Sequence, residues 1–149
     1  MFTMLPKPSP TANALTYSFW QKTAERIFQL QRCDDCHQSI FYPRRHCPHC
    51  WSQRLSTTRS SGRGTIVSIV EVHKAGHVAF QQETPYYVAL IDLDEGVRVI
   101  SNVVRKPAEV VVDIGARVEL LWQEQGAFTL PLFRLNQTTQ EEGSDETRA

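Results

Sequence analysis

Four cysteines carry the clearest chemistry in this sequence of 149 residues. They form two pairs, Cys33/Cys36 and Cys47/Cys50, with two residues inside each pair and ten residues between the pairs. Thiolates at this spacing bind one tetrahedral ion, because each pair reaches the metal from a tight turn. We therefore expect a closed structural site for Zn²⁺ with no open position for a substrate. Iron in a four-thiolate site is the alternative, since the same ligands suit both metals.

Disulfide bonding and redox chemistry are the other uses of paired cysteines. Disulfides need an oxidising compartment, and residues 1–16 lack the basic start and apolar stretch of a secretory signal. Two redox pairs this close together would compete for the same role. A metal site is the interpretation that uses all four cysteines, and we expect the protein in the cytoplasm.

Basic residues surround the cysteines. Arg32 precedes the first pair, and Arg44 and Arg45 stand between the pairs. They either offset the charge of about −2 that four thiolates leave on a divalent ion, or bind an external anion. Residues 1–80 carry ten basic and four acidic residues (+6), whereas residues 81–149 carry six and twelve (−6). The net charge of zero argues against a general attraction to nucleic acid or anionic membranes.

The remaining residues offer little catalytic chemistry. His73 and His77 have no obvious nucleophile or carboxylate partner in the sequence. The sequence contains no glycine-rich phosphate loop, no serine nucleophile elbow and no HExxH motif. No apolar run approaches the ~18 residues of a membrane span. We therefore expect no catalytic residue and no enzyme activity from this chain alone.

Composition divides the chain into five parts. Residues 1–15 hold three prolines and read as an extended arm. A helix is expected over residues 16–32, because Ser18 and Gln21 match a capping box and apolar residues follow at helical spacing. The zinc ribbon is expected over 33–61. The polar stretch from Ser52 to Arg63 is expected to connect the ribbon to the strands that follow. An OB-fold over 62–136 and a disordered acidic tail over 137–149 complete the chain.

The expected fold class is mainly β, with the helix and ribbon preceding a five-stranded OB-fold barrel. Five segments have the β-branched and aromatic composition of strands, and a further short piece is expected at 110–112. The five segments are residues 65–73, 86–92, 97–104, 117–123 and 128–135. The segment from Lys74 to Pro85 is then a loop at one end of the barrel.

The order of these parts resembles a known family, the acyl-CoA-associated proteins with a rubredoxin-like zinc ribbon and an OB-fold, long catalogued as a domain of unknown function. The resemblance covers Tyr17 to Leu135. It implies a non-catalytic accessory subunit that binds a thiolase-type enzyme or a related aldolase and helps to hold its acyl-CoA. It also implies an assembly with two copies of each chain. An enoyl-CoA hydratase complex is the alternative to the thiolase or aldolase partner. The segments that carry it are residues 19–33, 42–50, 62–68, 85–98 and 114–119.

The resemblance also suggests residues for binding. The helix and ribbon would dock on the enzyme, and the loop after residue 73 would approach the coenzyme A channel. Arg44, Arg45, Lys74 and His77 are the expected contacts to coenzyme A or to the partner. The family often has glycine after each cysteine pair, where this chain has His37 and Trp51. We therefore expect a different shape for the second turn, since tryptophan tolerates positive φ poorly. The Trp51 side chain either packs in the ribbon, which we favour, or is an exposed anchor for a partner.

A single-stranded nucleic-acid module is the rival from another functional class. OB-folds and ribbons both serve there, and stacking aromatic residues with a cation would be needed. Tyr86, Tyr87, Phe80 and Arg98 are the residues that could form such a surface. The balanced charge and the acidic second half make this rival the weaker hypothesis.

Overall fold

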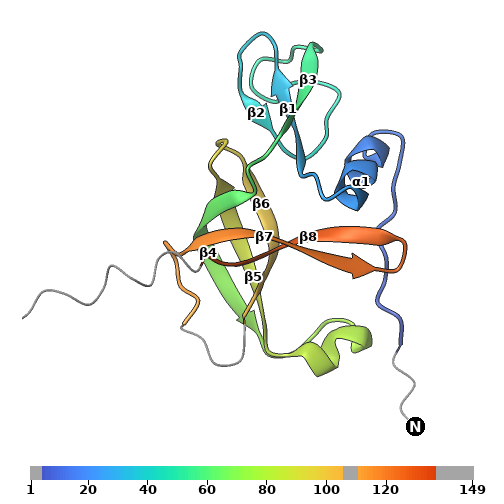
Figure 1. The fold of residues 1–149 in the computed structure, drawn as a ribbon, viewed down its shortest axis with the longest axis vertical. Coiled ribbons are helices and arrows are strands. Elements are labelled where there is room, and N and C mark those ends of the chain that lie inside the picture. Colours follow the sequence, from blue (N-terminus) through green and yellow to red (C-terminus); the bar gives the residue numbers. More distant parts are fainter. Residues whose placement is uncertain (1–4, 106–110, 137–149) are drawn as a thin grey trace, which may run out of the picture.

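The fold is mainly β, as the sequence predicted, with one helix, a small three-stranded sheet and a closed five-stranded barrel (Figure 1). It comes from a computed structural model that describes residues 5–105 and 111–136. The elements are α1 (Tyr17–Ala24), β1 (Gln29–Cys33), β2 (Ser39–Ile40), β3 (Leu55–Arg59), β4 (Arg63–Val72), the 3₁₀ helix η1 (Val78–Glu83), β5 (Tyr86–Leu93), β6 (Arg98–Val104), β7 (Arg117–Gln125) and β8 (Phe128–Leu135).

The helix is shorter than the expected 16–32. It ends after Ala24, and residues 29–33 form strand β1. Arg26 takes a positive φ of 59° directly after the helix, its N–H donates to the carbonyl of Thr23, and the N–H of Ile27 donates to that of Lys22. This is a Schellman ending, in which the left-handed position is usually glycine. Because arginine fills that position here, the sequence carries no stop signal.

The predicted capping box is also wrong. The N-cap is Thr16, and its side chain does not cap the helix. Instead the Asn13 side chain accepts hydrogen bonds from the backbone N–H groups of Leu15 and Thr16. The Ser18 hydroxyl donates to the Gln29 side chain, in β1. An asparagine turn therefore starts the helix.

The small sheet, with strand order β2-β1-β3, includes the segment expected to be a connector. Strand β3 pairs antiparallel with β1 along its whole length, from Gln29 opposite Arg59 to Cys33 opposite Leu55. Its composition is polar because β3 is a strand at the edge of the sheet, where Ser56, Thr57 and Arg59 are exposed to water. The zinc ribbon therefore begins at β1, before the first cysteine.

The barrel has the strand order β4-β5-β6-β8-β7, and β4 closes it by pairing with β7. All neighbours are antiparallel except β6 and β8, which run parallel over two residue pairs. Its fully buried core includes Ile66, Ile91, Val118 and Phe133. The expected short strand at 110–112 is absent where it can be seen: Val111 and Val112 lie in no strand, and residue 110 is outside the described residues.

Helix α1 lies between the ribbon and the barrel (Figure 1). Phe19 is buried in a group of aromatic rings with Phe28, Phe41 and Tyr42, at centroid distances of 5.6–5.9 Å. On the barrel side, Trp20 meets Phe128 of β8 edge to face at 5.2 Å. These contacts fix the ribbon relative to the barrel through the helix.

The loop between β4 and β5 folds around η1 and meets the N-terminal arm. Lys7 pairs with Glu83 and lies 5.5 Å from the centre of the Phe80 ring. The Gln125 side chain donates to the carbonyl of Pro8 at 2.9 Å. The described part of the arm is therefore tied to the barrel. Among the described residues, no helix is long and apolar enough to cross a membrane.

Candidate metal centre and binding surfaces

The four cysteine sulfurs converge at one end of the ribbon. All lie within 4.8 Å of one another, with 3.5 Å between Cys33 and Cys50 and 3.6 Å between Cys36 and Cys47. Sulfurs at about 2.3 Å from one tetrahedral ion would be about 3.8 Å apart. The donor set and its spacing therefore fit one ion, and four ligands would close its coordination sphere.

Two equivalent turns position these sulfurs. In the first, the Cys33 N–H donates to Gln38 and the His37 N–H to Cys33; in the second, Cys47 donates to Ser52 and Trp51 to Cys47. His37 and Trp51 have φ values of 62° and 64°. The second turn therefore has the same shape as the first, and the expected difference is wrong. A tryptophan takes the left-handed conformation there, because the turn geometry imposes it.

The thiols affect each other's protonation. The Ser52 N–H lowers the pKa of Cys50, but burial and the three neighbouring cysteines outweigh it and raise that pKa to about 12. The pKa of Cys36 is also raised, whereas the Cys36 N–H holds the pKa of Cys33 below its usual value. Four adjacent thiols resist losing all their protons, so four thiolates require a cation.

Asp35 and Arg54 form an ion pair beside the cysteines. Asp35 accepts from the Arg54 guanidinium and the Ser52 hydroxyl. The sulfurs accept from backbone groups instead: Cys36 N–H to Cys33 at 3.5 Å, and His49 N–H to Cys47 at 3.4 Å. That Arg32, Arg44 and Arg45 offset the negative charge of the thiolates stays a prediction.

A hollow of about 520 Å³, here called the ribbon hollow, opens beside the metal-binding turns. Its lining includes Leu15, Tyr42, Pro43, Arg44, Arg45 and Trp51. Two of the four predicted contact residues therefore lie together in one cavity. Tyr42 packs against the helix through Phe19, and Leu15 precedes the helix, so the hollow lies between ribbon and helix.

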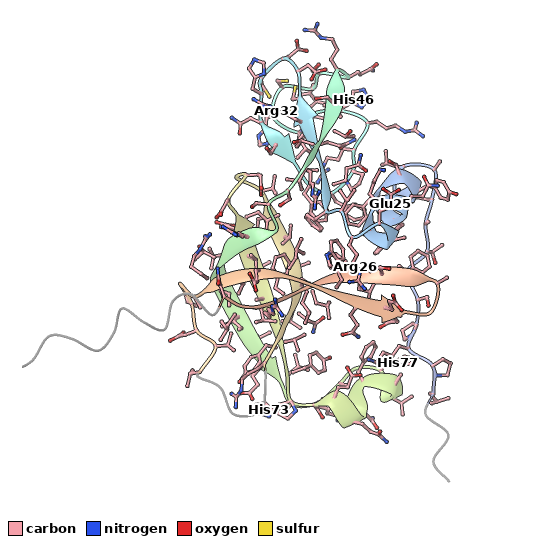
Figure 2. All side chains as sticks on the ribbon, viewed as in Figure 1. Glu25, Arg26, Arg32, His46, His73 and His77 are labelled. Atoms are coloured by element: carbon pink, nitrogen blue, oxygen red, sulfur yellow. The ribbon has the colours of Figure 1, made fainter. Side chains whose placement is uncertain are left out.

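The other two predicted contacts lie far from the ribbon hollow. Lys74 and His77 are exposed in the loop before η1, and His77 accepts the Ala79 N–H at its Nδ1 atom. Figure 2 labels His46 on the ribbon and His77 beside η1, at opposite ends of the long axis. The four residues therefore cannot surround one small ligand within a single chain.

A second hollow, of about 800 Å³, lies at the η1 end of the barrel. Phe80, Tyr86 and Tyr87 line it, as the nucleic-acid hypothesis requires, but so do Glu71 and Glu83. Arg98, the fourth residue of that hypothesis, is not part of this lining. It donates two hydrogen bonds to Asp92, at 2.6 and 2.9 Å. Lys7 and Arg105 also line the hollow, but Lys7 pairs with Glu83, so the cations and carboxylates of the lining balance. A hollow without excess positive charge and a paired Arg98 both weaken the case for nucleic acid.

Sequence reasoning missed part of the ribbon hollow. The sequence carries no sign of a binding role for Leu15 or Tyr42, and of the two expectations for Trp51 it favours a residue packed in the ribbon over an exposed anchor. Trp51 is in fact 78% exposed. The signal was present: a large aromatic residue stands where the family often has glycine, and packing within so small a sheet leaves little room to bury it.

Comparison with family models matches both parts of the chain. Residues 20–56 match the model described as "ChsH2, rubredoxin-like zinc ribbon domain". Residues 57–123 match the one described as "ChsH2, C-terminal OB-fold domain". The boundary between the two models falls within β3.

Curated relatives carry several names. The chain is 35% identical over 129 residues to a "Probable enoyl-CoA hydratase alpha subunit" of Thermomonospora curvata, covering 86% of this chain but only 40% of that protein. It is 32% identical over 107 residues to a "DUF35 domain-containing scaffold protein" of Methanocaldococcus jannaschii, covering 70% and 74%. It is 31% identical over 78 residues to "Benzoylsuccinyl-CoA thiolase subunit BbsA" of Thauera aromatica, covering 51% of each.

A solved structure matches over nearly the whole length of its own chain. The chain is 35% identical to one chain of the structure described as "Ltp2-ChsH2(DUF35) aldolase", with a TM-score of 0.74. The match covers 85% of this chain and 98% of that one. Helix, ribbon and barrel therefore recur together in a relative.

Proposed function

This chain belongs to the ChsH2 family, also called DUF35, and on that premise we propose that it is a non-catalytic accessory subunit. It binds a thiolase-like enzyme or a related aldolase and helps to hold the acyl-CoA substrate of that enzyme. The reaction forms or cleaves a carbon–carbon bond of the acyl-CoA. The catalytic residues belong to the partner.

The observation that carries this proposal is the match to the aldolase structure. That match spans 98% of a relative's chain at 35% identity, and the relative's description joins it to a second protein, Ltp2. The thiolase subunit adds a carbon–carbon bond reaction on a CoA thioester, by its name. All four cysteines of this chain gather in the cluster, so none is left to serve as a separate nucleophile.

The metal has a structural role in this proposal. Cys33, Cys36, Cys47 and Cys50 hold one Zn²⁺, which fixes both turns and closes the ribbon. Zinc is favoured over iron because it is the common ion of four-thiolate structural sites. A colourless protein with one equivalent of zinc supports this assignment, whereas visible absorption would indicate iron.

The predicted contacts divide between two surfaces. Arg44 and Arg45 lie with the ribbon and helix, which dock on the enzyme. Lys74 and His77 lie on the loop that approaches the coenzyme A channel, where the lysine offers a charge to phosphate. Their separation on opposite ends of one chain favours a large partner. From the family resemblance we infer an assembly with two copies of each chain.

A hydratase partner is the second candidate. It is favoured by the relative from T. curvata, which is named as a hydratase alpha subunit and is 35% identical. This chain spans 40% of that relative's length, so the hydratase name describes a protein of which more than half has no counterpart in this chain. The aldolase match leaves almost none of its chain unmatched, and we rank it first for that reason.

Affinity capture from the native organism tests the proposal. The tagged chain is recovered at mild salt, and proteins in fixed ratio to it are identified by mass spectrometry. We expect a thiolase or aldolase subunit in near-equal amount. Its turnover of acyl-CoA should depend on a catalytic residue in that subunit and not on one in this chain. A hydratase would select the second candidate. Nucleic-acid-binding proteins released by salt would contradict both candidates.

A further inference from the structure

The ribbon hollow has the composition of a protein-binding hot spot. Trp51 exposes 78% of its surface, more than any other large hydrophobic residue in the described part of the chain. Tyr42 and two arginines line the same cavity. Tryptophan, tyrosine and arginine are the residues that contribute most to binding energy at protein interfaces.

The backbone around the hollow is also held in place before any partner arrives. The Trp51 N–H donates to the Cys47 carbonyl at 2.9 Å, which ties the backbone that carries the ring to the metal-binding turn. The Gln31 side chain accepts from the Arg44 N–H at 2.7 Å and donates to the Arg44 carbonyl at 3.0 Å. Strand β1 therefore fixes the backbone of the arginine loop, so binding orders the side chains but need not order the main chain.

The charges of the hollow are unpaired. Within residues 5–105 and 111–136, no hydrogen bond or ion pair joins the guanidinium of Arg44 or Arg45 to another residue. Arg54, Arg98 and Arg117 elsewhere each pair with an aspartate. Two adjacent free guanidinium groups beside an exposed aromatic ring are complementary to carboxylates flanking an apolar side chain.

We propose that the ribbon hollow docks an acidic segment of the enzyme subunit. Carboxylates of the segment pair with Arg44 and Arg45, and an apolar side chain lies on the Trp51 ring. The inference rests on the proposed function, since it names the chemistry by which the accessory subunit recognises its enzyme. A protein segment is favoured over a nucleotide because Leu15, Pro43 and Pro48 give the hollow an aliphatic wall.

The two equivalent turns supply a matched test. Trp51→Gly removes the ring at a position with positive φ, and His37→Gly makes the same backbone change in the other turn. Arg44→Glu/Arg45→Glu reverses the charges, and Arg59→Glu on β3 of the same sheet controls for charge alone. Affinity is measured by titrating the co-purified enzyme subunit, with zinc content as the check on folding.

We expect Trp51→Gly and Arg44→Glu/Arg45→Glu each to weaken the complex by about 30-fold or more. The two controls stay within about threefold, and wild-type affinity falls steeply with salt. A photo-crosslinking residue at position 51 labels a peptide of the enzyme subunit that is rich in aspartate and glutamate.

Three results would overturn the inference. Unchanged affinity in both variants leaves the proposed function standing and removes this docking site. Loss of binding to 3′,5′-ADP in the arginine variant, with affinity for the enzyme unchanged, makes the hollow a nucleotide site instead. A wild-type chain that binds no enzyme subunit removes both the docking site and the proposed function.

Discussion

At the residue scale, the two metal-binding turns carry backbone strain that glycine would relieve. His37 and Trp51 both take a φ near 60°, which costs a residue other than glycine about 1–2 kcal/mol. Both side chains are exposed, so little packing is lost when either is removed. Because the exposed Trp51 ring adds little packing energy to offset the strained backbone, a role of the ring in binding a partner explains why tryptophan occupies this position.

We therefore expect Trp51→Gly and His37→Gly each to stabilise the zinc-loaded protein by about 1 kcal/mol. Urea unfolding with excess zinc gives the difference in free energy. A loss of stability in Trp51→Gly alone would mean that its ring packs in the free protein, and the assignment of the ring to a partner would lose its support.

The buried cysteines carry the metal assignment. Cys47 is fully buried, so Cys47→Ser removes a ligand where no other side chain or water easily replaces it. We expect bound zinc to fall from one equivalent to nearly none and the ribbon to unfold, because metal binding provides most of the folding energy of such small domains. Elemental analysis and circular dichroism measure both effects, with His46→Ala as the control. Full zinc retention in the serine variant would be incompatible with a four-cysteine site.

The cysteine cluster was predictable from the sequence because spacing alone brings the sulfurs of each pair together. The ribbon hollow was not predictable from the sequence, because it depends on the direction in which the second turn presents Trp51, the residue that follows it. Gln31 could be recognised as the residue that fixes the Arg44 loop only from the pairing of β1 with its neighbours.

At the scale of the elements, the barrel strands were predictable and the helix end was not. Strand β8 has the bounds that its composition predicted, Phe128–Leu135, because a run of mostly phenylalanine and leucine follows the turn at Gly126. Residues 27–33 continue an apolar spacing that a helix could use. The left-handed Arg26 turns the chain instead, and pairing with β3 makes the segment a strand.

Helix α1 should depend on one buried ring. Phe19 is 3% exposed and contacts the rings of Trp20 and Phe28, so Phe19→Ala leaves a cavity between helix, ribbon and barrel. We expect a loss of about 3–4 kcal/mol in the free energy of unfolding. Tyr17→Ala, at an exposed position of the same helix, should change it by less than about 0.5 kcal/mol. Similar small effects in both variants would show that the helix is not packed as described.

An ion pair links the turn between β5 and β6 to the start of β7. The Arg117 guanidinium donates two hydrogen bonds of 2.8 Å to Asp94 and holds the pKa of that carboxyl below its usual value. The folded pKa is lowered, so the stabilisation exists above the usual aspartate pKa and is lost as pH falls through the folded value.

We expect Asp94→Asn to reduce stability at pH 7 by about 0.5–1 kcal/mol, since the pair is partly exposed. The difference from wild type should shrink as pH falls below about 4. Urea unfolding across this pH range checks both points, with Glu124→Gln as a control for charge. A difference independent of pH would point to lost packing rather than lost charge.

At the scale of the whole molecule, the fold places two candidate surfaces far apart. The ribbon hollow lies at one end and the loop with η1 at the other, with the barrel between them (Figure 2). An enzyme much larger than this chain can contact both surfaces, whereas one small ligand cannot. The resemblance of the ordered parts predicted the family from the sequence, because helix, ribbon and barrel follow in a specific order. The separation of the four predicted contact residues became visible only in the folded chain.

The most direct test of the accessory role is the acyl-CoA turnover of the purified enzyme subunit as this chain is added. We predict that the chain alone gives no turnover, and that kcat/KM of the enzyme rises until the two chains are equimolar and then stays constant. An enzyme whose kcat/KM is the same with and without this chain, or turnover by this chain alone, would contradict the account.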